Sequence, residues 1–234
     1  MENKQNIWAV TLILTAIAGY CDTLTFVAAD SIFSAHVTGN FIVFAYQLIK
    51  GTGGGDWIKL LTFPIFIFSV MVGGWIATRF VNKHFLLLCE GVILLGGGIA
   101  AYLLGYIDDG VITWPMYTIT MLVVFAMGLQ NAYGKLFPKD TFGPTTMMTG
   151  NVTQLALDLK GVLSNGLSDT AHVTGVKNGL ITIIGFLAGC CLGAYTGKLF
   201  GLVGIVLPGV CMVACYFYTT STTSTTSATD NITA

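Results

Sequence analysis

Charged side chains are scarce in this sequence: only 9% of its 234 residues are Asp, Glu, Lys or Arg, whereas 54% are hydrophobic. A water-soluble domain usually carries about 25% charged residues, so the charges are too few to cover a surface in water. The net charge of -1 and the lack of a basic run argue against a nucleic-acid partner. The sequence therefore predicts an integral membrane protein whose first partner is the lipid bilayer.

Residues for catalysis and metal binding are also rare. There are three histidines, His36, His84 and His172, whereas a Ser-His-Asp or Cys-His arrangement needs a base that a third group orients. No metal-binding spacing such as HExxH occurs. The six cysteines all lie in apolar stretches, where buried thiols are the simplest expectation. We therefore predict no enzymatic activity, no cofactor and no metal site.

Long apolar runs are abundant, and a helix needs about 20 such residues to span a bilayer. Turn or charged residues bound runs at 8–28, 33–49, 58–80, 85–107, 112–132, 143–159, 178–197 and 199–218. The runs predict an all-α, polytopic bundle of 6–8 transmembrane helices that forms a single domain over residues 1–234. The Ser/Thr-rich segment 219–234 is predicted to be a disordered tail.

Two of the runs are polar and interrupted by glycine, and they indicate an internal duplication. The tripeptide Thr-Gly-Asn at residues 38–40 recurs at residues 149–151. Upstream, Asp22 near the end of the first run corresponds to Asn131. We therefore predict two repeats, at about residues 8–107 and 112–218.

A stripe of small residues recurs in the same order. The stripe of the first repeat is Ser69, Gly73 and Ala77, and that of the second is Gly189, Gly193 and Gly197. Small residues at every fourth position let helix backbones approach closely in lipid. The stripes predict helix packing, with a pore-lining seam as the less favoured alternative, and they leave room for a homodimer contact.

The orientation of the repeats has two solutions. If every run spans the membrane, each repeat has four helices and the repeats are parallel. If the two Thr-Gly-Asn segments re-enter the membrane, six spans remain and the three-span repeats are inverted, as is common in transporters. In the eight-span arrangement Lys and Arg divide equally between the two faces, so the positive-inside rule is only weakly informative. The sequence leaves both solutions open.

The motifs Gly19-Tyr-Cys-Asp22, Phe33-Ser-Ala-His-Val-Thr-Gly-Asn40 and Met148-Thr-Gly-Asn151 resemble the YoaK family of bacterial integral membrane proteins. The similarity extends from about residue 8 to residue 218. It implies a multi-pass protein of the bacterial inner membrane, in a family of unknown function, and it supplies neither a substrate nor catalytic residues. The second repeat departs from the pattern, with Asn131 in place of Asp22 and Met147 in place of His36.

Polar groups at membrane depth are costly, so they are candidates for a functional site. Asp22 and His36 are the candidate proton-sensitive pair, and Asn131 is the uncharged counterpart of Asp22. Hydrophobic segments that glycine interrupts at corresponding positions of two repeats favour a binding site between the repeats. The candidate residues lining a central path are Thr38, Gly39, Asn40, Thr149, Gly150, Asn151 and Gln154.

Structural alternatives stand beside these assignments. Asp22 is equally suited to bind backbone donors, and Gly39 and Gly150 to let two helices cross while Asn40 and Asn151 bond across. Glu90 is a candidate coupling carboxylate, or a partner of a nearby basic residue. We predict a transporter or channel for a small solute. The alternative is a scaffold or sensor whose polar residues only hold helices together.

Overall fold

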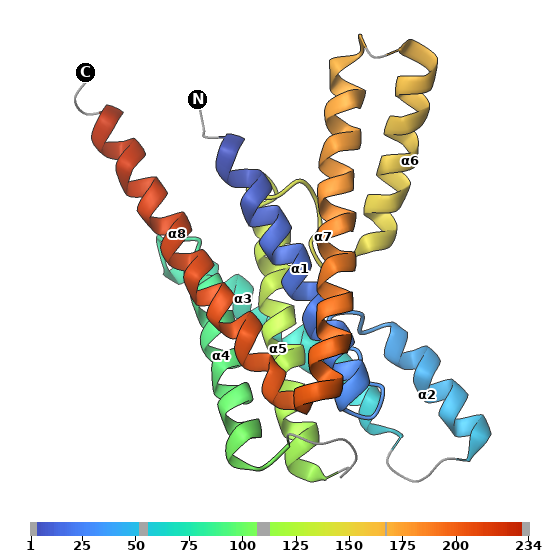
Figure 1. Cartoon of the computed structure of the whole chain (residues 1–234). Helices are drawn as coiled ribbons and strands as arrows, with labels where there is room; N and C mark the ends of the chain where they lie inside the picture. The colour runs from blue at the N-terminus through green and yellow to red at the C-terminus, as the bar shows by residue number, and fades with distance from the viewer. Residues whose placement is uncertain (1–3, 52–55, 107–112, 167, 231–234) are drawn as a thin grey trace.

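The computed structural model describes residues 4–51, 56–106, 113–166 and 168–230, and every regular element in these ranges is helical. The elements are α1 (Lys4–Ala28), α2 (Gly39–Lys50), α3 (Ile58–Arg79), α4 (Phe85–Leu103), α5 (Trp114–Leu136), α6 (Met148–Asn165), α7 (Thr170–Phe200), the 3₁₀ helix η1 (Gly201–Ile205) and α8 (Val206–Asp230). The long helices gather into one bundle (Figure 1). The all-α helical bundle is therefore confirmed.

Four helical stretches are long and apolar enough to cross a membrane: Ile7–Ala28, Ile58–Arg79, Phe85–Leu103 and Thr170–Thr220. The chain is accordingly a membrane protein. The last stretch contains α7 and α8, between which the chain reverses direction at Gly201. Gly201 has φ 52°, a value that glycine adopts without the steric cost of a Cβ atom.

Helix α5 is not among these four stretches, yet it lies inside the bundle. Most of its central residues, from Met116 to Tyr133, are buried by neighbouring helices. A helix that is surrounded by protein does not need an apolar surface on every side. This explains why α5 carries Gln130 and Asn131 near its end.

The tightest helix pair is α1 and α7. A Cβ atom added at Gly189 would collide with the carbonyl oxygen of Ala16, and one added at Gly193 with that of Tyr20. The residue numbers rise together along both helices, so α1 and α7 run in the same direction. The glycine stripe of α7 is therefore a packing surface, as its spacing predicts.

The stripe of α3 packs in the same way against α5. A Cβ atom at Gly73 would lie 2.6 Å from the Cβ of Ala132, and one at Gly128 would lie 2.6 Å from Ser69. The Ser69 hydroxyl also donates a hydrogen bond to the carbonyl oxygen of Phe125. The third helix of each predicted repeat thus packs on the first helix of the other, and the two halves interlock.

Corresponding helices of the two predicted repeats run in opposite directions. In the α4–α8 pair, Gly91 faces Val213 whereas Gly98 faces Val206, so the helices are antiparallel. In the α1–α5 pair, the Gln130 side chain near the end of α5 reaches the carbonyl of Leu14 in the first half of α1. These contacts favour the six-span alternative with inverted repeats. The division into repeats is itself still a prediction.

The short helices α2 and α6 splay away from the bundle toward opposite ends of it (Figure 1). Around the Cβ position of Gly150 no described atom lies within 4 Å, and the atoms nearest to that of Gly39 belong to Phe33 and His36 of its own loop. The prediction that Gly39 and Gly150 let these two helices cross is therefore wrong. Each glycine-containing helix packs on the helix that follows it, α2 on α3 and α6 on α7.

Helix α8 enters the Ser/Thr-rich segment 219–234 and ends at Asp230. The disorder of this segment is still a prediction. Threonine hydroxyls support the helix here, because Thr219 and Thr220 donate to the carbonyl oxygens of Cys215 and Tyr216 four residues earlier. Residues 231–234 lie outside the described residues.

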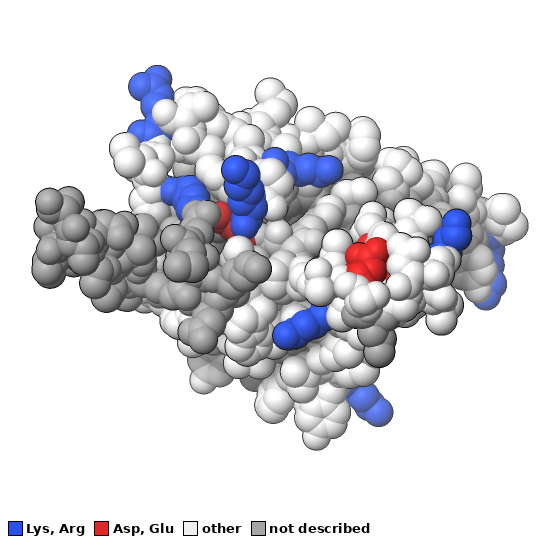
Figure 2. All heavy atoms as spheres, turned by 90° about the horizontal axis from the view of Figure 1, so that it is seen from above, with Lys and Arg blue, Asp and Glu red and all other residues white. Residues whose placement is uncertain are grey.

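Basic residues gather at one end of the bundle, which we call the basic end. It is formed by the start of α1, the α3–α4 connection, the end of α5 and the α6–α7 connection. Lys and Arg outnumber Asp and Glu on this face (Figure 2). The residues concerned are Arg79, Lys83, Lys135, Lys139, Lys160 and Lys177, whereas Lys50, Lys59 and Lys198 lie toward the opposite end.

Candidate functional site

Asp22 fixes the backbone of the loop that leads into α2. Its side chain is 5% exposed, and Oδ1 accepts hydrogen bonds from the backbone N–H groups of Ala35 at 2.7 Å and His36 at 3.0 Å. The His36 ring is exposed and packs against Phe33, with centroids 5.6 Å apart. Asp22 and His36 are thus neighbours, but the carboxylate binds the backbone, as the structural alternative expects.

Asn40 closes the same loop. Its Oδ1 accepts from the Phe33 N–H at 2.8 Å, and its Nδ2 donates to the Phe33 carbonyl at 2.8 Å and to the Thr62 hydroxyl at 3.0 Å. The buried side chain therefore connects residues 33–40 to α3. Thr38 is exposed, and Gly39 is buried.

The loop before α6 has the same construction. Asn131 donates to the Thr146 hydroxyl at 2.6 Å, and Asn151 donates to the Pro144 carbonyl at 2.7 Å. Thr146 and Pro144 follow Ala35 and Phe33 by 111 residues, the separation of the two Thr-Gly-Asn motifs. Asn40 Oδ1 accepts from the Phe33 N–H, but Pro144 has no N–H. Asn151 therefore has no bond that corresponds to this one.

Both loops fold back along the helix that they leave. Asp22 lies six residues before the end of α1, and it binds the loop at a depth of about 9 Å at 1.5 Å per residue. Asn131 occupies an equivalent place five residues before the end of α5. We call residues 29–38 and 137–147 the re-entrant segments, because each turns back along the helix before it and is followed by a helix that returns to the end from which the segment came.

The structure does not bring the two motifs into one central site. Since Gln130 meets Leu14, Asn131 lies at the level of about residue 13 of α1, roughly nine residues or 14 Å from Asp22. Thr149, Gly150 and Gln154 are exposed, and Gln154 donates to Asp158 on its own helix at 3.2 Å. The predicted residues thus form two separate polar sites.

Gln130 is a buried polar residue that the sequence analysis missed. Its Nε2 donates to the Leu14 carbonyl at 2.8 Å and to the Thr145 hydroxyl at 2.9 Å, so it connects α1, α5 and the second re-entrant segment. The signal in the sequence is an uncharged polar residue in an otherwise apolar helix, directly before the predicted Asn131.

A charged cluster closes the end of the bundle opposite the basic end. The Lys59 amine lies 2.6 Å from Asp30 Oδ2, and the Tyr117 hydroxyl donates to the same oxygen at 3.1 Å. The Lys59 side chain is 0% exposed. Asp30 and Ser31 have φ of 50° and 57°, a strained region for residues with a Cβ atom. We call Asp30, Lys59 and Tyr117 the opposite-end cluster.

A second cluster lies at the basic end. The Lys83 amine is 2.7 Å from Asp140 Oδ1, and the Tyr133 hydroxyl donates to Asp140 Oδ2 at 2.8 Å and lies 3.1 Å from His84 Nδ1. Burial and the neighbouring Lys83 lower the pKa of His84 below its usual value of 6.5. We call Lys83, His84, Tyr133 and Asp140 the basic-end cluster.

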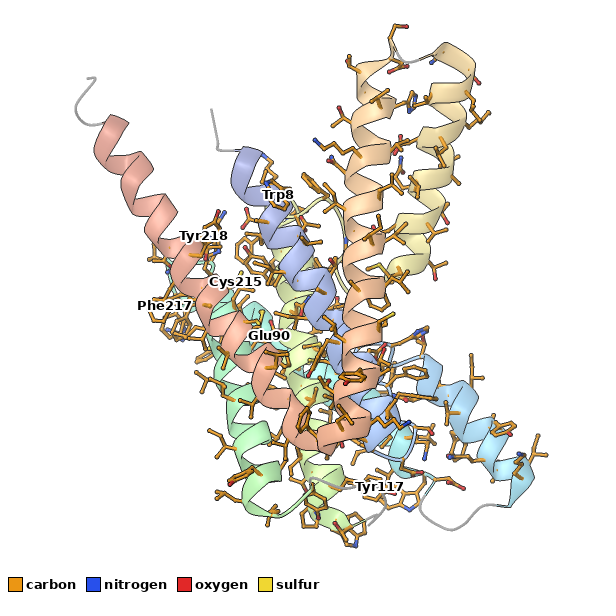
Figure 3. The ribbon with its side chains drawn as sticks, viewed as in Figure 1. Trp8, Glu90, Tyr117, Cys215, Phe217 and Tyr218 are labelled. Atoms are coloured by element: carbon orange, nitrogen blue, oxygen red, sulfur yellow. The ribbon has the colours of Figure 1, made fainter. Side chains whose placement is uncertain are left out.

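Glu90 differs from these groups because it is buried without a partner. Its side chain is 0% exposed, and within the described residues neither carboxyl oxygen has a hydrogen-bond partner. Lys83, one of its expected partners, is paired with Asp140 instead. Within the described residues Glu90 is thus a buried carboxyl without a basic partner (Figure 3), and its role as a coupling carboxylate is still a prediction.

Comparison with known proteins gives one match. The family model described as "Protein of unknown function (DUF1275)" matches residues 10–218. The chain belongs to this family. No curated protein and no solved structure matches it. Membership in DUF1275 agrees with the predicted class, a protein family without an assigned function, and the narrower resemblance to YoaK is still a prediction.

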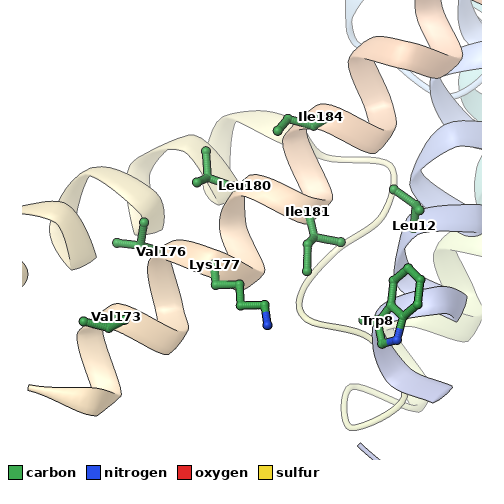
Figure 4. A pocket seen from close by; sticks show the side chains of 8 residues that line it. All are labelled: Trp8, Leu12, Val173, Val176, Lys177, Leu180, Ile181 and Ile184. Carbon is green, nitrogen blue, oxygen red and sulfur yellow. The ribbon is translucent and has the colours of Figure 1, made fainter. Parts of the chain in front are cut away.

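An apolar groove lies between the start of α1 and the first half of α7 (Figure 4). Most of its wall residues fall within the part of the chain that matches DUF1275. The groove has a volume of 490 Å³, and Lys177 is its one charged wall residue. Its other wall residues are Trp8, Leu12, Val173, Val176, Leu180, Ile181 and Ile184. Such a surface suits an apolar chain better than a polar solute, so it does not compete with the re-entrant segments as a solute site.

Proposed function

We propose that this protein is a multi-pass membrane transporter for a small solute. The observation that carries the proposal is the pair of re-entrant segments, residues 29–38 and 137–147, each anchored by a polar side chain of the preceding helix. Discontinuous helices at corresponding positions of oppositely oriented repeats are the usual pointer to a transport site. Non-helical backbone at membrane depth is tolerated where it is packed in protein or lines a water-filled cavity.

The topology that goes with this proposal has six spans, α1, α3, α4, α5, α7 and α8. The helices alternate in direction, so the start of α1 and the end of α8 lie at the basic end. Six of the ten Lys and Arg residues gather there, and Lys4 near the start of α1 is a seventh. Short cytoplasmic loops carry an excess of Lys and Arg, so we assign the basic end to the cytoplasm of a bacterial cell.

The two charged clusters are suited to act as gates in alternating access. Each joins helices from both predicted repeats: Asp30 and Lys59 meet Tyr117 at one end, and Lys83 meets Asp140 at the other. A transporter has to open one end while the other stays closed. In this mechanism the opposite-end cluster breaks in the outward-open state and the basic-end cluster breaks in the inward-open state.

The alternative function is a scaffold or sensor that moves no solute. It is favoured by the fact that Asp22, Asn40 and Asn151 all bind other groups of the protein. On that view the polar residues serve only to hold the helices and loops together. The two functions differ in whether a small molecule binds.

Thermal unfolding of the purified protein against a panel of small metabolites distinguishes them. A ligand at about 100 times its Kd stabilises the folded state by roughly 2.7 kcal/mol, which raises Tm. Gly150→Leu is the matching variant, since its Cβ position is open and the fold is expected to survive. It should abolish the rise in Tm and the uptake of that solute into proteoliposomes. Gly74→Leu, at an equally open position on α3, is the control.

If no metabolite changes Tm and none is taken up, the scaffold alternative is favoured. If a metabolite binds and Gly150→Leu keeps full binding and uptake, the protein is a transporter but the second re-entrant segment is not its site.

A further inference from the structure

Glu90 directly precedes Gly91, one of the glycines at which α4 and α8 pack closely. The adjacent Gly91 would place a Cβ atom 2.9 Å from Val213, and Gly98 would place one 2.6 Å from Val206. From α8, Gly209 approaches the backbone of Leu95 equally closely. The Glu90 side chain is 0% exposed, so the carboxyl group is withdrawn from bulk solvent at this packed part of the bundle.

The groups around Glu90 do not neutralise a negative charge. The thiols of Cys21 from α1 and Cys215 from α8, which are 0% and 2% exposed, lie within electrostatic range of Glu90. Cys215 in turn acts electrostatically on Tyr133 of α5. Asp22 also acts electrostatically on Cys21, and as an acid it supplies no positive charge that would neutralise a Glu90 carboxylate. No ion pair to Glu90 occurs in the described ranges, and an unpaired carboxylate in an apolar interior costs several kcal/mol.

A series of polar groups leads from this site to the basic end. Cys215 acts electrostatically on Tyr133, whose hydroxyl contacts both His84 and Asp140 toward the basic end. Lys83, which pairs with Asp140, has a side chain that is 37% exposed. Glu90 lies six residues beyond His84 on α4, at a depth of about 9 Å.

We propose that Glu90 is a proton-binding site in the interior of the bundle, and that the proton reaches it from the basic end through Tyr133 and His84. The neutral acid fits the closed contact between α4 and α8. Loss of the proton to the basic end leaves a carboxylate that the closed contact does not stabilise, so it favours separation of the two helices. The inference goes beyond the transport of a solute, because it names the proton as a ligand and requires no solute.

Infrared spectroscopy of the purified protein in nanodiscs tests the proton on Glu90. At about pH 7, where a free glutamic acid is ionised, the wild type should show the C=O stretch of a protonated carboxyl. Glu90→Gln, which keeps the size of the side chain, should remove that band. Asp22→Asn is the matched control and should leave it, because it replaces a different buried carboxyl, one whose Oδ1 accepts two backbone N–H bonds. A spectrum that Glu90→Gln does not change overturns the proposal.

Deuterium exchange of the same band tests the route. Tyr133→Phe and His84→Gln should each slow the exchange by at least about tenfold, since each removes a group able to pass a proton. Tyr117→Phe removes a hydroxyl of the same helix at the opposite end and should leave the rate unchanged. Equal rates in all four proteins overturn the route through the basic end.

Sodium chloride at constant pH distinguishes a proton site from a metal-cation site. The band should be insensitive to sodium, and its loss on addition of sodium would contradict the proposal. None of these measurements needs a transported solute. A protein that passes them and takes up no metabolite binds a proton without being a solute transporter, so the two proposals fail independently.

Discussion

Asp30 and Asp140 are 110 residues apart in the sequence and occupy equivalent places at opposite ends of the bundle. Each carboxylate binds a lysine and a tyrosine: Lys59 and Tyr117 at Asp30, Lys83 and Tyr133 at Asp140. The two clusters differ in burial, because the Lys59 side chain is 0% exposed and that of Lys83 is 37% exposed. Burial decides how much each ion pair contributes to stability.

Lys59→Met should therefore be strongly destabilising. It leaves Asp30 without its cation, and breaking a buried ion pair costs about 3–5 kcal/mol. The double variant Lys59→Met/Asp30→Asn should recover part of this loss. Lys83→Met is the control and should cost about 1 kcal/mol or less. Unfolding in denaturant, monitored by circular dichroism, measures all four proteins, and equal losses for Lys59→Met and Lys83→Met would contradict the prediction.

Substitution of a glycine should destabilise the protein where a neighbouring helix fills the Cβ position, and it should be tolerated where that position is open. Gly193→Ala directs a methyl group into the Tyr20 carbonyl of α1 and should cost about 3 kcal/mol or more, or prevent folding. Gly96→Ala, on α4, meets no described atom within 4 Å and should stabilise the helix by about 0.5–1 kcal/mol. Size-exclusion chromatography and Tm report both effects. A well-folded Gly193→Ala protein with unchanged Tm would show that α1 and α7 are not in close contact.

Replacement of the unpaired carboxyl should stabilise the protein. Glu90→Met keeps a similar length and removes two polar oxygens without partners, so the free energy of unfolding should rise by about 1–3 kcal/mol. Asp22→Leu also removes a buried carboxyl, but it deprives two backbone N–H groups of their acceptor and should be destabilising. If Glu90→Met is the more destabilising of the two, Glu90 has a partner in the folded protein.

Acid should weaken the fold through His84. Its pKa lies below the usual 6.5 in the folded state, so the unfolded chain takes up the proton first as the pH falls. The contribution of His84 to stability is thus present above about pH 6.5 and is lost as the pH drops through that value toward the folded-state pKa. His84→Gln, which keeps a side chain able to hydrogen bond to Tyr133, should reduce the slope of Tm against pH between about 7.5 and 5.5.

A different carboxylate is the internal reference for this pH experiment. Hydrogen bonds from Asn165 and the His172 N–H lower the pKa of Asp169 below its usual 3.8. Its contribution is present above about pH 3.8 and is lost below it. Asp169→Asn should therefore change the slope of Tm only in more acidic solution. An identical slope for wild type and His84→Gln between about pH 7.5 and 5.5 would contradict the assignment to His84.

The proposed orientation is testable by cysteine labelling in intact cells. With the native cysteines replaced, Lys139→Cys at the basic end should be protected from a membrane-impermeant maleimide, because that end faces the cytoplasm. Lys50→Cys at the other end should be labelled. Disruption of the cells should make both positions reactive. Labelling of Lys139→Cys from outside would reverse the assigned orientation.

The sequence by itself determined the solvent and the kind of fold. With 9% charged residues and long apolar runs, the chain has no way to form a water-soluble surface, and helices satisfy their own backbone hydrogen bonds in lipid. Its internal match also located Asn40 and Asn151, which do close equivalent loops. These features depend on composition and local pattern, which require no knowledge of distant contacts.

Only the tertiary structure decided what the polar residues contact. The sequence predicted an imidazole beside Asp22, but the carboxylate binds backbone N–H groups, and every residue has such groups. The contacts of Gly91 with Val213 and of Gly98 with Val206 show that α4 and α8 are antiparallel. The inverted arrangement follows from this direction, which the sequence does not reveal. Glu90 is isolated because Lys83 pairs with Asp140, 57 residues farther along the chain. Such long-range choices are made by packing, because the side chains compete for partners that only the folded chain brings together.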